Sequence, residues 1–176
     1  EKDSHDNHSI SELDLRQIRA TYYGMMSEID SQFGRLIDYL KETGAYDNTL
    51  IIFTTDHGEY LGDHWMFSKY CYFEQTFHIP LILRDPASGA RSSRGSAVDA
   101  FTESIDIMPT ILDAVGVDIP EQCDGHSLLP FCRGEQPDGW RQEYHAEFYE
   151  PHYFEVFDGL PRQRNGYVDL PKGPGL

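Results

Sequence analysis

An acidic residue and an imidazole stand side by side at Asp56 and His57, directly before Gly58. Carboxylate oxygen and imidazole nitrogen together suit a hard or borderline divalent cation, which withdraws charge from a phosphate or sulfate ester and favours attack on it. Neighbouring strand residues point to opposite faces, so both side chains serve one site only if the strand ends here and Gly58 lets the backbone turn. An Asp that caps a turn beside a structural His fits the spacing equally well.

Further polar side chains follow shortly after this pair. Asp63 and His64 repeat the acid and imidazole, and the spacing favours groups that orient the first pair, or a plain polar loop, over direct metal ligation. Lys69 could neutralise an oxyanion as a point charge, although a single lysine is more often a solvated surface group. Four isolated residues are expected to be structural or exposed: His78, Asp106, His126 and His145.

The elements that would position these residues are a strand and two helices. Leu50 to Thr54 is an apolar, β-branched run typical of a strand buried on both faces, and the carboxyl end of such a strand in an α/β sheet opens onto the ligand crevice. A helix is predicted from Ser11 to Gly44, and a second from Ser104 to Gly116. The first carries an apolar stripe expected to pack in the core: Ile18, Tyr22, Met25, Ile29, Phe33, Leu36 and Leu40.

Other strands are predicted with weaker signals. Ile79 to Leu83 is a short apolar run with Pro80 near its start, where a missing backbone donor is tolerated. Ala97 to Phe101 is predicted as a short strand, and Trp140 to Tyr149 as an edge strand.

The three cysteines, Cys71, Cys123 and Cys132, are too few and too irregularly spaced for a disulfide framework or a structural zinc site, so reduced thiols are expected.

Composition narrows the class of function. The 176 residues have 39% hydrophobic residues and a formal net charge of −16, and their 14 scattered basic residues provide no surface for nucleic acid. No apolar run is long enough to cross a bilayer. The N-terminal EKDSHDNHS has neither an initiator Met nor the pattern of a signal peptide, so the compartment, cytoplasmic or periplasmic, stays open.

Several segments together resemble the sulfatase branch of the alkaline phosphatase superfamily, which includes arylsulfatases, choline sulfatases and phosphonate monoester hydrolases. The resemblance covers residues 15 to 134 in the order of the family's motifs. It is carried by YYGMMSEIDSQFGRLIDYLKETGAYDNTLIIFTTDHGEYLGDH, Lys69, YFEQTFHIPLILRDP, ESIDIMPTILDAVGV and DGHSLLP. It implies an α/β fold, a partial alkaline-phosphatase-like sandwich of central sheet strands with flanking helices, followed by the start of a C-terminal subdomain.

The resemblance also implies roles for individual residues. Asp56 and His57 match the family's late pair of metal ligands, with Ca²⁺ or Mn²⁺ as the expected metal. Lys69 matches the lysine that contacts the sulfuryl or phosphoryl oxygens, and Glu74 lies where a packing or orienting role is expected. The implied substrate is a small sulfate or phosphonate/phosphate ester. His57 and the GDH segment favour phosphonate monoester hydrolases or phosphodiesterases, while the YFE segment is similar to choline sulfatases.

The family's nucleophile is missing from these residues. It is a formylglycine made from Cys or Ser in a Cys/Ser-x-Pro-x-Arg motif, and none of the three cysteines has that context. The chain therefore resembles the C-terminal part of such an enzyme, with half of the metal site, and is expected to be inactive alone. Residues 1–135 are predicted to belong to the catalytic domain and residues 136–176 to a truncated C-terminal subdomain or tail.

Two alternatives stay open beside the hydrolase interpretation. The chain could be a non-catalytic metal-binding or interaction domain that keeps the fold without the nucleophile. Another metal-dependent phosphotransferase of the same superfamily is disfavoured by the IPLILRDP match. The identity of the metal and homo-oligomerisation are left undetermined by the sequence.

Overall fold

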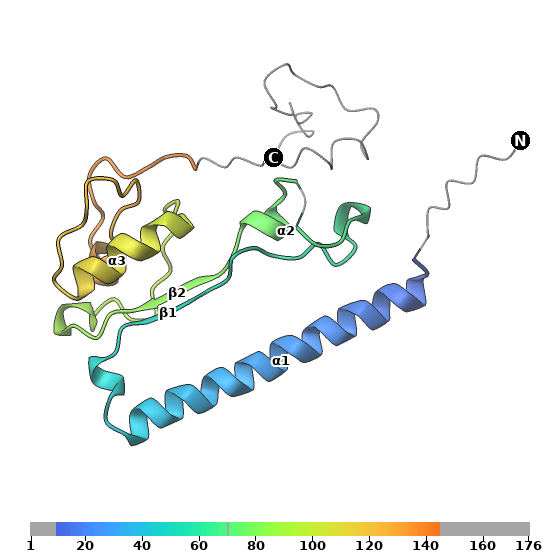
Figure 1. The fold of residues 1–176 in the computed structure, drawn as a ribbon, viewed down its shortest axis with the longest axis horizontal. Helices are drawn as coiled ribbons and strands as arrows, with labels where there is room; N and C mark the ends of the chain where they lie inside the picture. The colour runs from blue at the N-terminus through green and yellow to red at the C-terminus, as the bar shows by residue number, and fades with distance from the viewer. Residues whose placement is uncertain (1–9, 70, 145–176) are drawn as a thin grey trace, which may run out of the picture. The chain divides into compact units, whose positions relative to one another are not determined.

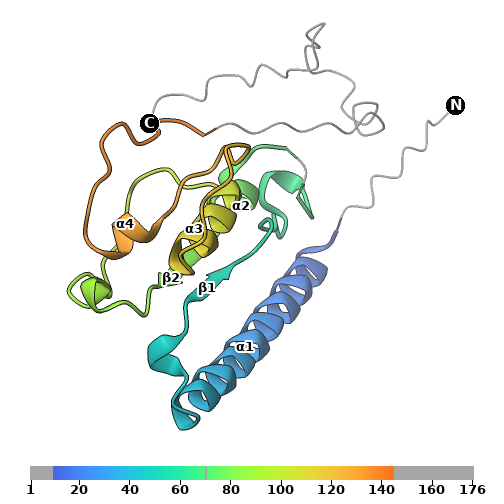
Figure 2. The same ribbon diagram turned by 60° about the vertical axis from the view of Figure 1, so that its left-hand side comes forward.

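A two-stranded antiparallel sheet lies at the centre of the computed structural model, which describes residues 10–69 and 71–144. Strand β1 (Ile51–Thr54) pairs with β2 (Leu81–Arg84), and Ile51 stands opposite Arg84. In both views the sheet lies between the long helix α1 and the short helix α3 (Figures 1 and 2). Both strands were predicted, within one or two residues of their bounds. Their side chains are half-buried or exposed, so the expectation of a strand buried on both faces is wrong for the described residues.

Helix α1 (Glu12–Glu42) begins where the sequence predicted. The Ser11 hydroxyl accepts the backbone N–H of Asp14 at 3.1 Å, and the Asp14 carboxylate accepts the N–H of Ser11 at 3.3 Å. This reciprocal cap satisfies donors that have no partner within the helix, and it places a negative charge near the positive end of the dipole. The helix ends before Gly44, whose φ of 71° suits glycine.

The half-buried face of α1 differs from the predicted stripe. Its half-buried residues are Leu15, Arg19, Tyr22, Phe33, Ile37 and Leu40. The ring of Phe33 packs against Phe53 of β1 with a centroid separation of 5.2 Å. Four residues of the predicted stripe are exposed instead: Ile18, Met25, Ile29 and Leu36. No residue of α1 is fully buried, so the apolar stripe is only partly covered by the rest of the described chain.

The second predicted helix is present as α3 (Ile107–Ala114), preceded by a 3₁₀ turn, Ser104–Asp106. The described residues also form two single-turn helices, α2 (Glu74–Phe77) and α4 (Leu129–Cys132). The predicted strand at 97–101 is wrong, because these residues form an irregular segment. Residues 140–144 are not a strand either, and the rest of that predicted edge strand lies outside the described residues. All three cysteines are free thiols.

A carboxylate anchors the end of the described chain. Asp106 is 0% exposed, and its two oxygens accept the backbone N–H groups of His126 and Glu103, each at 2.8 Å. Arg141 donates to both oxygens, at 2.7 Å from Nη2 to Oδ1 and through Nη1 to Oδ2. Two segments distant in sequence are therefore tied to the turn before α3, in line with the structural role expected for Asp106.

Within the described part of the chain, the structure contains no helix with the length and apolar character needed to span a membrane. The predicted boundary between residues 135 and 136 stays a prediction. The side chain of Trp140 donates from Nε1 to the carbonyl oxygen of Phe101 at 2.8 Å, so residues just beyond that boundary contact the preceding part of the fold.

Candidate metal and anion site

The turn after β1 brings Asp56 and His57 together. Nε2 of His57 lies 3.5 Å from Oδ2 of Asp56. Oδ1 of Asp56 accepts the backbone N–H of His57 at 3.0 Å and the hydroxyl of Thr55 at 3.3 Å. The strand has ended at Thr54, so the alternation of side chains no longer separates the two residues. Of the predicted site residues, these two are the pair in direct mutual contact.

Hydrogen bonding fixes which ring nitrogen of His57 is available. Nδ1 lies 2.7 Å from the carbonyl oxygen of Gly58, which can only accept, so Nδ1 carries the proton and donates it. In the neutral imidazole, Nε2 is then left with a free lone pair on the side of Asp56. Metal-binding histidines generally donate their other ring N–H to a carbonyl or carboxylate in this way, because the bond fixes the tautomer and the ring orientation.

The Asp56 side chain is 81% exposed and its carboxylate favours the ionised form. Desolvation raises the pKa of Asp56, but the charge of His57 and hydrogen bonds from the His57 backbone and Thr55 outweigh it. The net result is a pKa below its ordinary value. An ionised oxygen of Asp56 therefore stands 3.5 Å from Nε2 of His57.

These two donors fit one half of a cation site. Oxygen and nitrogen ligands lie about 2.0–2.6 Å from Zn²⁺ or Ca²⁺, so donors 3.5 Å apart can contact one ion. Among residues 10–69 and 71–144, no group of three or more His, Cys, Asp or Glu side chains is placed to hold a metal. A complete coordination sphere would need ligands beyond those described.

Gly58 is required by a close approach of two chain segments. Its N–H donates to the carbonyl oxygen of Thr76 at 3.0 Å. A Cβ atom at this position would lie 1.9 Å from the carbonyl oxygen of Gln75, well inside van der Waals contact. Glycine therefore allows the turn after Asp56 and His57 to pack against α2.

Gly58→Ala is expected to destabilise the fold by about 1–3 kcal/mol, because the backbone must move to relieve the overlap. It should also weaken metal binding, since the displaced turn carries both donors. Gly89→Ala is the matched control, because a Cβ there meets open space. Urea unfolding and metal titration of the three proteins test this, and equal stability of the two variants would contradict it.

Asp63 and His64 lie in the loop that follows and have other partners. The Asp63 carboxylate accepts from Arg19 at 3.4 Å and from Gln75 at 3.2 Å. The His64 ring stacks on Phe73 with centroids 4.0 Å apart. These contacts fix the loop against α1 and the start of α2. That Asp63 and His64 also orient the metal ligands stays a prediction.

Lys69 and Glu74 both have exposed side chains. Glu74 accepts a bond of 2.8 Å from Nδ1 of His78, one helical turn away. The anion-binding role of Lys69 and the packing or orienting role of Glu74 remain predictions.

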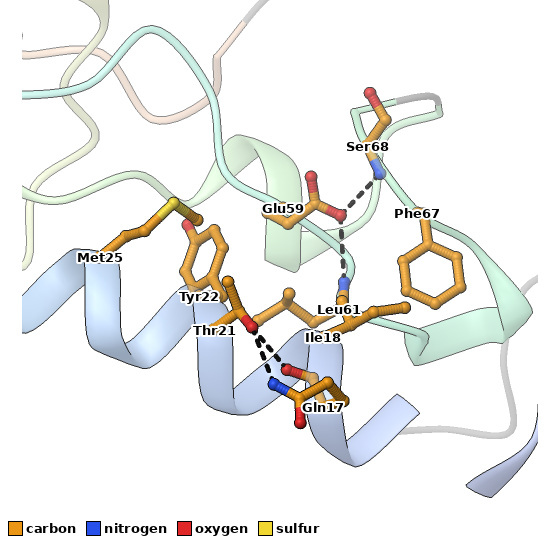
Figure 3. A pocket seen from close by; sticks show the side chains of 9 residues that line it. All are labelled: Gln17, Ile18, Thr21, Tyr22, Met25, Glu59, Leu61, Phe67 and Ser68. Carbon is orange, nitrogen blue, oxygen red and sulfur yellow. Dashed lines mark hydrogen bonds between the residues drawn. The ribbon is translucent and has the colours of Figure 1, made fainter. Parts of the chain in front are cut away.

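Two residues that fix the loop were missed by sequence reasoning. Arg19 donates from Nε to the carbonyl oxygen of Leu61 at 2.9 Å, and Glu59 accepts two backbone N–H groups of the loop. A hollow of about 390 Å³ lies between this loop and α1, with Glu59 and Leu61 on one side and Ile18 and Tyr22 on the other (Figure 3). The signal for Arg19 was a charge within an apolar helical face, and Glu59 had no signal beyond its place after Gly58.

Comparisons with known proteins identify the family of this chain. The sulfatase family profile matches residues 1–117. A multifunctional alkaline phosphatase superfamily protein of Trinickia caryophylli, PehA, is 49% identical over 80% of this chain and 27% of its own length. An arylsulfatase of Clostridium perfringens is 36% identical over 78% of this chain and 28% of its own length.

Solved structures show the same relationship. The phosphonate monoester hydrolase of Agrobacterium radiobacter is 47% identical, with a TM-score of 0.71 over 76% of this chain and 26% of that protein. This chain thus spans about a quarter of the length of these relatives. The predicted fold class is confirmed: the chain has part of an alkaline-phosphatase-like α/β fold. Because the family profile covers well over half of its residues, this chain belongs to the sulfatase family.

Proposed function

We propose that this chain is part of a metal-dependent hydrolase of sulfate or phosphonate/phosphate esters. The observation that carries the proposal is the contact between Asp56 and His57, with Nδ1 of His57 bonded to a carbonyl and Nε2 turned to the carboxylate. These two residues would hold a divalent cation, Ca²⁺ or Mn²⁺. Bound there, the cation would supply positive charge to the oxygens of the transferred group.

The chain's own residues would act by holding and neutralising the ester. Lys69 would offer its ammonium group to the sulfuryl or phosphoryl oxygens, where charge builds up during transfer. His57 would keep its proton on Nδ1, because the Gly58 carbonyl accepts it. The attacking group is proposed to be a formylglycine from a segment outside these residues, since no Cys/Ser-x-Pro-x-Arg sequence occurs in them.

Of the two ester classes, we favour the phosphonate and phosphate esters. The Agrobacterium radiobacter phosphonate monoester hydrolase shares 47% of its aligned residues with this chain, against 36% for the Clostridium perfringens arylsulfatase. The resemblance at His57 favours phosphonate monoester hydrolases, and in the structure His57 lies in contact with Asp56. A sulfate ester is the alternative substrate.

The test is a substrate panel on a full-length enzyme that contains this chain. We expect hydrolysis of an aryl phosphonate monoester to exceed hydrolysis of an aryl sulfate, and both to disappear when the metal is removed with a chelator. Residues 1–176 alone should hydrolyse neither ester. Robust metal-dependent turnover by residues 1–176 would contradict the missing nucleophile, and metal binding by an inactive full-length protein would favour a binding domain.

A further inference from the structure

The loop from Glu59 to Ser68 lies between the two parts of the proposed site. Asp56 and His57 precede it, and Lys69 follows it. Its two ends meet at a neck formed by Glu59, Tyr60 and Ser68, where the N–H of Tyr60 donates to the carbonyl oxygen of Ser68 at 3.2 Å. Compact loops with adjoining ends hold the residues at those ends in a fixed relation. The neck therefore sets the path of the chain from the metal ligands to Lys69.

The carboxylate of Glu59 closes this neck. Its Oε1 accepts the backbone N–H of Ser68 at 2.6 Å and the backbone N–H of Leu61 at 3.3 Å (Figure 3). Hydrogen bonds to an ionised acceptor are shorter and stronger than those between neutral groups. Both bonds converge on the same oxygen, so one suitably placed acceptor atom is sufficient to bind the N–H groups of Leu61 and Ser68.

Ser68 has a backbone conformation that serine rarely adopts. Its φ is 68°, in the left-handed region where a Cβ atom is disfavoured. Such a conformation persists only when the surroundings enforce it. The bond from its N–H to Glu59 does so, and Lys69 is the next residue along the chain. The direction in which Lys69 leaves the loop thus depends on Glu59.

The rest of the loop is anchored independently of Glu59. Tyr60 is 1% exposed, and its hydroxyl lies 3.2 Å from Oγ1 of Thr76. Arg19 binds the carbonyl oxygen of Leu61, as described above. Removal of the Glu59 carboxylate should therefore leave the Ser68 end of the neck held, among the described residues, only by the backbone bond from Tyr60, while the loop stays attached to α1 and α2.

We propose that Glu59 is a positioning residue for hydrolysis, because it holds the neck closed and so presents Lys69 to the anion bound beside Asp56 and His57. The inference rests on the proposed function of Lys69. Glu59 would not touch the substrate. Its effect would reach the reaction only through Lys69, and this distinguishes it from a residue that merely stabilises the loop.

The test is a double-mutant cycle in the full-length enzyme that contains this chain. Glu59→Ala should lower kcat by about 10–100-fold, the range found when a group that orients a functional side chain is removed, with a smaller change in KM. Glu59→Gln should recover most of the activity, because its single amide oxygen can accept both N–H groups. In the Lys69→Ala background, Glu59→Ala should have little further effect, since the residue it positions is gone.

Two further measurements keep the result interpretable. Hydrogen exchange at the Ser68 amide should accelerate in Glu59→Ala and not in Glu121→Ala, an exposed glutamate in another loop. Thermal melts identify a variant that has simply unfolded. If Glu59→Ala has unfolded, the comparison of kcat between Glu59→Gln and wild type decides. Multiplicative losses from Glu59→Ala and Lys69→Ala, or full activity of Glu59→Ala, would overturn the inference. Full activity of Lys69→Ala would overturn the proposed function of Lys69 instead.

Discussion

Asp56→Asn should lower the metal affinity of the enzyme that contains this chain by more than about 100-fold, because losing a partner outside the coordination sphere already costs about 10–100-fold. The amide has the shape of the carboxylate and can still accept the N–H of His57, so the local turn should survive. What disappears is the negative charge beside Nε2 of His57. Hydrolysis should fall with metal occupancy and recover in part at high metal concentration.

Calorimetric metal titration and steady-state kinetics over a range of metal concentrations measure this effect. Asp99→Asn is the matched control, because it removes an exposed carboxylate from a loop. A metal affinity for Asp56→Asn equal to that of the control would show that Asp56 only caps the turn, which is the alternative that the sequence left open.

Asp106→Ala should destabilise the fold by about 3–5 kcal/mol, the usual cost of removing one partner of a buried ion pair. The side chain of Arg141 is only 15% exposed. Without Asp106, its remaining ion-pair partner among the described residues would be the Glu103 carboxylate, at 3.2 Å. The substitution would also remove the acceptors of two backbone N–H groups. Urea unfolding measures the change, and Asp118→Ala, an exposed carboxylate, should cost little.

The same carboxylate should make stability depend on pH. Burial raises the pKa of Asp106, but hydrogen bonds from Arg141, His126 and Glu103 outweigh burial and hold it below the ordinary value of 3.8. The folded state therefore binds this proton less readily than the unfolded state. The stabilisation is fully present above the ordinary pKa and is lost as the pH falls through the folded pKa. Asp106→Asn should lack this acid-dependent component, and an unchanged acid profile would contradict the assignment.

Local signals in the sequence predicted the elements that begin or end at marked residues. The Ser11 cap, Gly44 and the β-branched run before Asp56 fixed the bounds of α1 and β1 to within one or two residues. The adjacency of Asp56 and His57 also followed, because Gly58 marked the end of the strand. Each of these features depends on the conformational preferences of residues that are neighbours in the chain, and such preferences can be read directly from the sequence.

Tertiary contacts decided the features that the sequence did not predict. Which stripe of α1 is covered depends on the surface that it meets, so Leu15 and Ile37 are half-buried while Ile29 and Leu36 are exposed. The segment 97–101 has only Val98 and Phe101 as strand-favouring residues, and the described chain places no partner strand beside it. Glu59 could not be identified from the sequence, because its carboxylate accepts from backbone N–H groups. Such groups carry no signal of their own in the sequence.

The bond between Arg19 and Leu61 has a consequence for the order in which the chain folds. It joins residues 42 positions apart, and closing so long a stretch costs more entropy than forming a helical turn. Helix α1 forms from contacts within a few residues, whereas the β1–β2 pairing and the Arg19–Leu61 bond both join distant residues, so the loop should become ordered only after α1 has formed and packed against it. The loop before Lys69, on the proposed anion-binding side of the site, would then be the last part of this segment to become ordered and the first to be lost when the helix detaches.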